Sequence, residues 1–168
     1  MGINVSGGSL GGGLFYVKTE NVPIGTGIGG AQTADLFNIT GIVEIVDMFF
    51  VMHDIVDSTT FADVGMVLND GVGTVAVTDV NDCSGLLDFD TIIHEGGGMD
   101  GSWTESVLNL SVNDFTVRGP VDCETTIVSG TAGSMLTLSY LEDASTELQI
   151  DFYIAYRKLS ADAVITAI

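Results

Sequence analysis

Apolar and polar residues alternate with a period of two along much of the chain. In residues 148–156 every even position is apolar, and Gln149 and Asp151 fall between them. Side chains of a strand point alternately to its two faces, so such a segment predicts a strand with one face on a core. Shorter segments with the same pattern are Val75–Val77, Leu108–Val112 and Leu136–Tyr140.

Residues 42–53 are apolar at nearly every position and rich in β-branched and aromatic side chains. This composition predicts a central strand buried on both faces, with a bulge near Asp47 and Met48. Asn69-Asp70-Gly71 lies between two apolar segments and predicts a hairpin turn. Helix signals are weak, and only residues 33–37 suggest as much as a single turn.

These strands and turns predict an all-β fold, an antiparallel β-sandwich with a jelly-roll-like arrangement. Residues 1–13 include six glycines and few side chains able to pack, which predicts a flexible Gly-rich N-terminal arm. Residues 14–168 are expected to form a single β-sandwich domain, because no long polar linker divides them. The polar residues 142–146 are expected to form the loop between the last two long strands.

The chain is strongly acidic. It has 23 Asp and Glu against 4 Lys and Arg, which gives a net charge of −19. Such a surface repels phosphates, so partners among nucleic acids and anionic membranes are not expected. The charge fits either a surface adapted to saline surroundings or a surface that meets a cation or a basic partner. Hydrophobic residues make up 46% of the chain, which argues against disorder and favours a homo-oligomer that covers apolar surface.

Targeting and redox signals are sparse. The first residues lack a basic segment followed by an apolar one, so no secretion signal is predicted and synthesis in the cytoplasm is expected. Cys83 and Cys123 are the two cysteines. In such a chain two thiols favour the reduced, buried state, with a disulfide between them as the alternative.

Motifs with catalytic associations lack their structural context. Residues 25–30 satisfy G-x-G-x-x-G, but no helical pattern follows to bind a dinucleotide. His53 beside Asp54 and His94 beside Glu95 have no recognisable nucleophile, and solvated strand ends explain them. We therefore predict no catalytic residue, no organic cofactor and no enzymatic activity.

One acidic loop suggests a metal. Asp79, Asn81 and Asp82 offer oxygen ligands within four residues, and calcium prefers oxygen ligands. The spacing lacks the glycine and the terminal glutamate of an EF-hand loop. These three residues are the candidate ligands of a structural calcium ion.

Partner contacts are expected at rare basic residues and at isolated apolar ones. Trp103, the only tryptophan, is either a contact anchor or a core residue at the start of a strand. The arm can become ordered only against a neighbour, because glycine contributes no buried side chain. The candidate contact residues are Ile3, Val5, Leu10, Lys18, Trp103, Arg157 and Lys158.

The order of segments in the C-terminal third resembles that of small virion surface proteins of tailed bacteriophages, of the capsid decoration and head-fibre type. The resemblance rests on residues 126–134, the Ala144-Ser145-Thr146 loop, the alternating strand 148–159 and the short apolar end 163–165. Earlier segments in a compatible order are residues 14–17, 41–45 and 66–69.

The resemblance implies a structural virion protein that binds a phage capsid and stabilises or decorates it. Its expected partners are the major capsid protein or other virion proteins and further copies of itself, as a homo-trimer, on the outer capsid surface. The alternatives are another virion component, such as a head fibre, neck or tail adaptor, and a calcium-dependent carbohydrate-binding or adhesion module.

Overall fold

The computed structural model describes residues 13–78, 80–94, 103–106 and 126–168. In this part of the chain the regular structure consists of strands alone, and no helix is long and apolar enough to cross a membrane. The strands are β1 (Leu14–Ile24), β2 (Gly30–Asp57), β3 (Phe61–Asn69), β4 (Thr74–Ala76), β5 (Thr91–His94), β6 (Trp103–Ser106), β7 (Thr126–Glu142), β8 (Glu147–Lys158) and β9 (Val164–Ala167).

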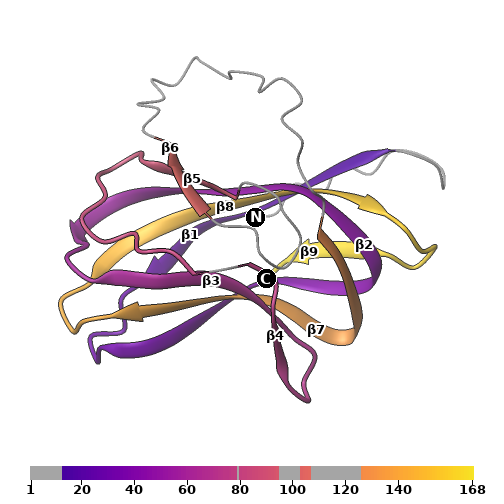
Figure 1. Cartoon of the computed structure of the whole chain (residues 1–168), viewed down its shortest axis with the longest axis horizontal. Coiled ribbons are helices and arrows are strands. Elements are labelled where there is room, and N and C mark those ends of the chain that lie inside the picture. The colour runs from indigo at the N-terminus through magenta and orange to yellow at the C-terminus, as the bar shows by residue number, and fades with distance from the viewer. Residues whose placement is uncertain (1–12, 79, 95–102, 107–125) are drawn as a thin grey trace.

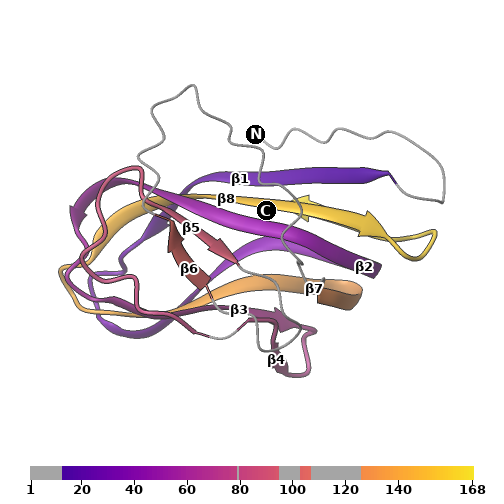
Figure 2. The same cartoon turned by 45° about the horizontal axis from the view of Figure 1, so that its top comes forward.

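All strand pairs are antiparallel, and the long strand β2 belongs to two layers (Figures 1 and 2). Its N-terminal half, residues 30–45, lies between β7 and β9, and this layer continues through β3 to β4. We call this layer sheet I. Its C-terminal half, residues 43–57, lies between β8 and β5, with β1 and β6 at the edges. We call this layer sheet II.

The strand order is that of a jelly roll. If the two halves of β2 are counted separately, sheet II runs β1, β8, second half of β2, β5, and sheet I runs first half of β2, β7, β3, β4. This is the arrangement of two interlocked Greek keys, to which β6 and β9 add one edge strand each. The predicted antiparallel, jelly-roll-like β-sandwich is therefore confirmed.

The core lies between the two sheets. Phe37 of sheet I meets Phe152 of sheet II edge to face, with ring centroids 6.0 Å apart, and Phe50 stacks on Phe152 at 5.7 Å. All three side chains are fully buried. The Tyr156 hydroxyl accepts a hydrogen bond from the backbone N–H of Ile165, which ties β8 to β9 across the layers. The buried apolar side chains form one continuous cluster.

The predicted bulge in β2 is confirmed. The pairing of β2 with β8 shifts register between Ile45 and Asp47. Ile45 and Met48 are both buried although they are three residues apart, because the extra residue restores the inward direction after the shift. The bulge bends β2 at the point where it passes from sheet I to sheet II.

The single turn suggested for residues 33–37 is wrong, because these residues lie within β2. Another register shift of β2, between Asp35 and Phe37, explains the misleading pattern. Leu36 and Phe37 are adjacent and both fully buried, so the period of two is interrupted there. A bulge and a helical turn both place adjacent apolar residues on one side, and the local sequence does not separate them.

Other local predictions are confirmed. β3 and β4 form a hairpin around Asn69-Asp70-Gly71, with Leu68 opposite Val75. Residues 143–146 join β7 to β8. Cys83 is buried. The predicted strand at residues 108–112, Cys123 and the arm lie outside the described residues, so those predictions stay predictions.

Candidate functional site

The outward side of sheet II carries a row of aromatic side chains. Lys18 of β1 lies opposite Tyr153 of β8, which lies opposite Phe49 of β2. The Phe49 and Tyr153 rings stack with centroids 4.6 Å apart, and the Lys18 ammonium lies 5.8 Å from the Tyr153 centroid. Burial, with a smaller effect of the Asp151 charge, raises the pKa of the Tyr153 hydroxyl. A strand is pleated, so the adjacent Phe50 and Phe152 point the other way, into the core.

Two further residues extend this row toward one end of the sheet. Tyr16 of β1 lies opposite Ala155 of β8, and the Tyr16 side chain is 58% exposed. We define the aromatic face as Tyr16, Lys18, Phe49, Tyr153 and Ala155. A tyrosine this exposed offers a large apolar ring with a polar tip, a combination that is frequent in protein interfaces.

The outward side of sheet I is chemically different. Thr33, Asp35 and Asn38 of β2 are exposed there, opposite Ser139, Thr137 and Met135 of β7. The Thr137 hydroxyl donates a hydrogen bond to Asp35 at 2.8 Å. This part of the surface is mainly hydroxyl, amide and carboxylate, whereas elsewhere on sheet I the aliphatic side chains of Ile42, Val75 and Ile127 are exposed. The two outer surfaces of the sandwich therefore differ in the side chains that they expose.

His53 ties β2 to β8 beside the aromatic face. Its Nε2 lies 3.1 Å from Oδ1 of Asp151, and its Nδ1 lies 3.4 Å from Oδ2 of Asp54. The backbone N–H of Asn21 donates to the same Asp151 oxygen at 2.8 Å. Both ring nitrogens of His53 thus face carboxylates, and this geometry orients the ring and cross-links three strands. The predicted solvated strand end is only partly right, because the His53 side chain is 15% exposed and β2 continues to Asp57.

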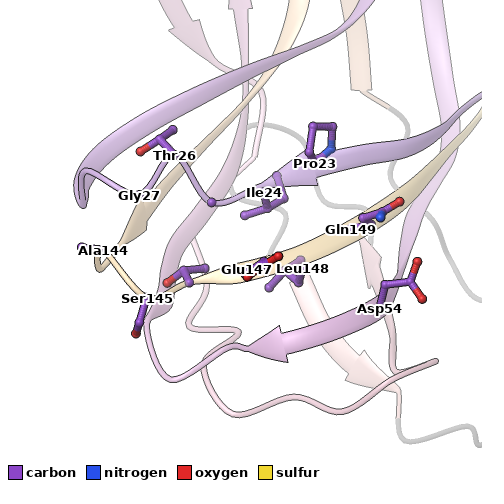
Figure 3. A pocket seen from close by; sticks show the side chains of 12 residues that line it. Pro23, Ile24, Thr26, Gly27, Asp54, Ala144, Ser145, Glu147, Leu148 and Gln149 are labelled. Carbon is purple, nitrogen blue, oxygen red and sulfur yellow. The ribbon is translucent and has the colours of Figure 1, made fainter.

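A hollow opens where β2 departs from β8. His53 pairs with Gln149 and Asp57 pairs with Glu147, so three residues of β2 face Leu148 alone. Asp54, the first of the three, has a φ of +50°, which turns the strand aside. The resulting groove has a volume of about 380 Å³. Figure 3 shows Asp54, Glu147 and Gln149 along it, with Thr26 and Ser145 toward the loops.

The loop between β1 and β2 forms the far wall of this groove. Gly25 has a φ of +117° and lies directly on the backbone of Thr146. The backbone N–H of Thr26 donates to Oε1 of Glu142 at 2.9 Å, and the Thr26 hydroxyl donates to the same oxygen. Glu142 is 2% exposed, and its Oε2 is buried with no hydrogen-bond partner in the described part of the protein. A buried carboxylate therefore stands behind the groove wall.

The β7–β8 turn that completes the wall is held by Asp143. Its Oδ1 accepts hydrogen bonds from the backbone N–H groups of Ser145 and Thr146, both at 2.9 Å, and from the Ser145 hydroxyl at 2.7 Å. These bonds, those from Ser145 first, lower the pKa of the Asp143 carboxyl to about 2. The turn keeps its shape because its carboxylate is satisfied locally.

The predicted basic contact residues come together on β1 and β8, although 139 positions separate Lys18 from Arg157. Each has an acidic or aromatic neighbour. Lys18 pairs with Glu20, Arg157 lies 3.0 Å from Glu44, and the Lys158 ammonium lies 4.9 Å from the Phe15 ring centroid. Trp103 begins β6, with its backbone opposite His94. Ile3, Val5 and Leu10 lie outside the described residues.

The described members of the predicted calcium loop have structural roles. The Asn81 backbone exchanges hydrogen bonds with Val64 at 2.8 and 3.0 Å. Asp82 Oδ1 accepts from the Ser84 backbone N–H at 2.9 Å, and bonds from Ser84 lower the pKa of the Asp82 carboxyl. Asp79 lies outside the described residues. Within the described ranges no three His, Cys, Asp or Glu side chains converge as metal ligands.

Sequence reasoning missed the groove and the aromatic row. The row had a signal at Tyr153, which occupies an outward position of the alternating segment 148–156, but not at Phe49, because residues 42–53 are apolar at nearly every position. The groove had no such signal, since its walls come from residues 23–27, Asp54 and residues 144–149.

Comparison with known proteins adds no relative. No family model, no curated protein and no solved structure matches the chain. Function is therefore inferred from the geometry and charge of this chain alone.

Proposed function

We propose that this chain is a non-enzymatic structural protein of a virus particle, which docks on the outer surface of a tailed-phage capsid through its aromatic face. The observation that carries the proposal is the inequality of the two outer surfaces. The exposed apolar side chains of sheet I, such as Ile42, Val75 and Ile127, are aliphatic, whereas sheet II presents aromatic rings, Tyr16 and the stacked Phe49 and Tyr153. Aromatic side chains that a partner covers often contribute a large share of the binding free energy of an interface.

Charge supports an external position. A protein with a net charge of −19 is repelled by packaged nucleic acid, which favours the outside of a capsid over its lumen. The jelly roll is compatible with this role, since viral capsid proteins use it, although lectins and cupins use it as well. The fold alone therefore does not select among virion, lectin and enzyme functions.

The aromatic face is also suited to a repeated lattice. Lys18 and Arg157 lie at its edge and already neutralise Glu20 and Glu44, so apolar contact is the main attraction this surface offers. The partner that we propose for this face is the major capsid protein. Self-association as a trimer would place three copies around one local threefold axis of the lattice.

The test removes one ring from the aromatic face. Purified protein is added to capsids of the encoding phage prepared without it, and bound protein is measured by cosedimentation. Tyr16→Ser should reduce affinity about tenfold, which corresponds to ~1.4 kcal/mol. Asn38→Ser, a substitution at an exposed position on sheet I, should bind like the wild type.

Three outcomes would reject or redirect the proposal. Wild-type protein that fails to sediment with the capsids contradicts it, and so does equal loss of binding in the Tyr16 and Asn38 variants. Binding at only a few copies per particle, at one vertex, would assign the chain to a neck or tail position instead.

A further inference from the structure

The groove beside the aromatic face is a shaped hollow rather than a flat surface. It lies where three residues of β2 face one residue of β8, and residues 23–27 and 144–149 form most of its wall. Its volume of about 380 Å³ lies near the lower end of the ~300–1,000 Å³ typical of ligand pockets. A hollow of this size accepts one side chain or one small ring.

The polar groups of the groove are mostly acceptors. Asp54 contributes a carboxylate from β2, whose Oδ2 also lies 3.4 Å from Nδ1 of His53. Glu147 contributes a second carboxylate from the start of β8, and Gln149 adds an amide oxygen. Behind the wall lies the buried Glu142, whose Oε2 has no hydrogen-bond partner among the described atoms.

The apolar groups of the groove lie beside these acceptors. Pro23 is next to Gln149 across the β1–β8 pair, and Ile24 is opposite Leu148. Pro23 is exposed and offers a short aliphatic surface, whereas Ile24 and Leu148 are buried in the core beneath it. An occupant with a methylene stem and a charged end matches this combination, because such a side chain packs its stem on apolar atoms and keeps its head among acceptors.

Other small ligands fit less well. An anion is repelled by Asp54 and Glu147. A neutral sugar lacks an aromatic ring to stack on, because the lining holds none. A calcium ion needs six to eight oxygen ligands, and among the described residues no three His, Cys, Asp or Glu groups converge.

We infer that the groove receives one basic side chain, an arginine in preference to a lysine, from the capsid protein. This inference rests on the proposed function and names the chemistry of the partner. The guanidinium group has five N–H donors in a planar fork, so it can serve Asp54, Glu147 and Gln149 together, whereas an ammonium group is a single point charge. The aromatic face then supplies the apolar contact, and the groove sets the register of docking.

The first experiment tests the groove without a capsid. Nα-acetyl-arginine methylamide is titrated into the full-length protein and followed by NMR, with the citrulline analogue as its neutral match. The arginine compound should shift the backbone amide signals of Asp54, Glu147 and Gln149 and saturate, and the citrulline compound should bind at least tenfold more weakly. Equal binding of both compounds, or preferential binding of maltose or Ca²⁺, would overturn the inference.

Matched variants show whether the two groove carboxylates are responsible. Asp54→Asn with Glu147→Gln should weaken arginine binding at least tenfold. The control, Asp63→Asn with Asp35→Asn, removes the same charge from sheet I. Asp63 is exposed and has the same φ of +50° as Asp54, so backbone strain is matched at one position of each pair. Asparagine tolerates this left-handed conformation, so both double variants should fold. Equal weakening of arginine binding in both double variants would show that net charge alone causes the loss, and this result would refute the inference.

The same variants in the capsid assay separate this inference from the proposed function. If wild-type protein binds capsids and the groove variant binds equally well, the groove inference fails while the docking proposal stands. If the protein binds the arginine compound through the groove but never binds capsids, the assignment to a capsid partner fails and the groove remains a basic-side-chain site.

Discussion

Replacing Gly25 by alanine should destabilise the loop that closes the groove in two ways, through an unfavourable backbone conformation and through a steric overlap. Gly25 has a φ of +117°, a conformation that L-residues rarely adopt. A Cβ atom there would overlap the carbonyl oxygen of Thr146 and lie 3.0 Å from its carbonyl carbon and 3.2 Å from Cα of Glu147. These are backbone atoms of the β7–β8 connection, so no side-chain rotation relieves the overlap.

Gly27, two residues later, is the matched control. It has a φ of +72°, and a Cβ atom there would meet nothing within 4 Å. Gly27→Ala therefore carries only the conformational cost, about 1 kcal/mol. Gly25→Ala adds an overlap with a wall that must move, about 1–3 kcal/mol more, for a total near 3 kcal/mol.

Thermal unfolding followed by circular dichroism measures the difference. At ~2–4 °C per kcal/mol for a chain of this size, Tm should fall by about 6–12 °C for Gly25→Ala and by about 2–4 °C for Gly27→Ala. Equal shifts in the two variants would refute the close approach of the loop to Thr146. The Gly25 variant should also lose binding of the arginine compound, because its loop wall is displaced.

Three further predictions concern acid, the core and salt. Hydrogen bonds from Ser145 hold the pKa of the Asp143 carboxyl at about 2, below its ordinary 3.8, so the stability that this group contributes is complete above pH ~4 and is lost as the pH falls toward 2. Asp143→Asn should therefore flatten the acidic part of a curve of Tm against pH, and an unchanged curve would contradict this role of Asp143. Phe152→Ala removes the ring between Phe37 and Phe50 and should cost about 3–5 kcal/mol in urea unfolding, and a loss under 1 kcal/mol would be inconsistent with the described core. Because 23 acidic residues face 4 basic ones, Tm should rise from low to moderate NaCl, and equally in CaCl₂ at matched ionic strength; an extra rise specific to calcium would instead support the predicted calcium loop.

The strands themselves were predictable from the sequence. The even residues of 148–156 are buried in β8, as their alternation indicates. The hairpin at Asn69-Asp70-Gly71 and the apolar central segment 42–53 were also recognisable. These features are local, because a pleated backbone sends successive side chains to opposite faces and a turn needs only a few residues of suitable conformation.

The breaks in β2 were less predictable. One bulge, near Asp47, was visible as an interruption of an apolar run, whereas the bulge near Leu36 resembled a turn. The breaks between Ile39 and Gly41 and after His53 were not predicted. Each bulge adds a residue that keeps β2 paired with its neighbour while its apolar side chains still point into the core. This register depends on the neighbouring strand and not on the alternation within β2.

The candidate site belongs almost entirely to tertiary structure. Sequence alone determined that the chain is acidic, all-β and able to present apolar surface. It could not determine that Lys18 would lie beside Tyr153, or that Asp54 and Glu147 would line the same hollow. The jelly-roll order pairs segments about a hundred residues apart, and their register is set by burial of one face of each sheet against the other. A groove formed by three residues opposite one exists only after that pairing is complete.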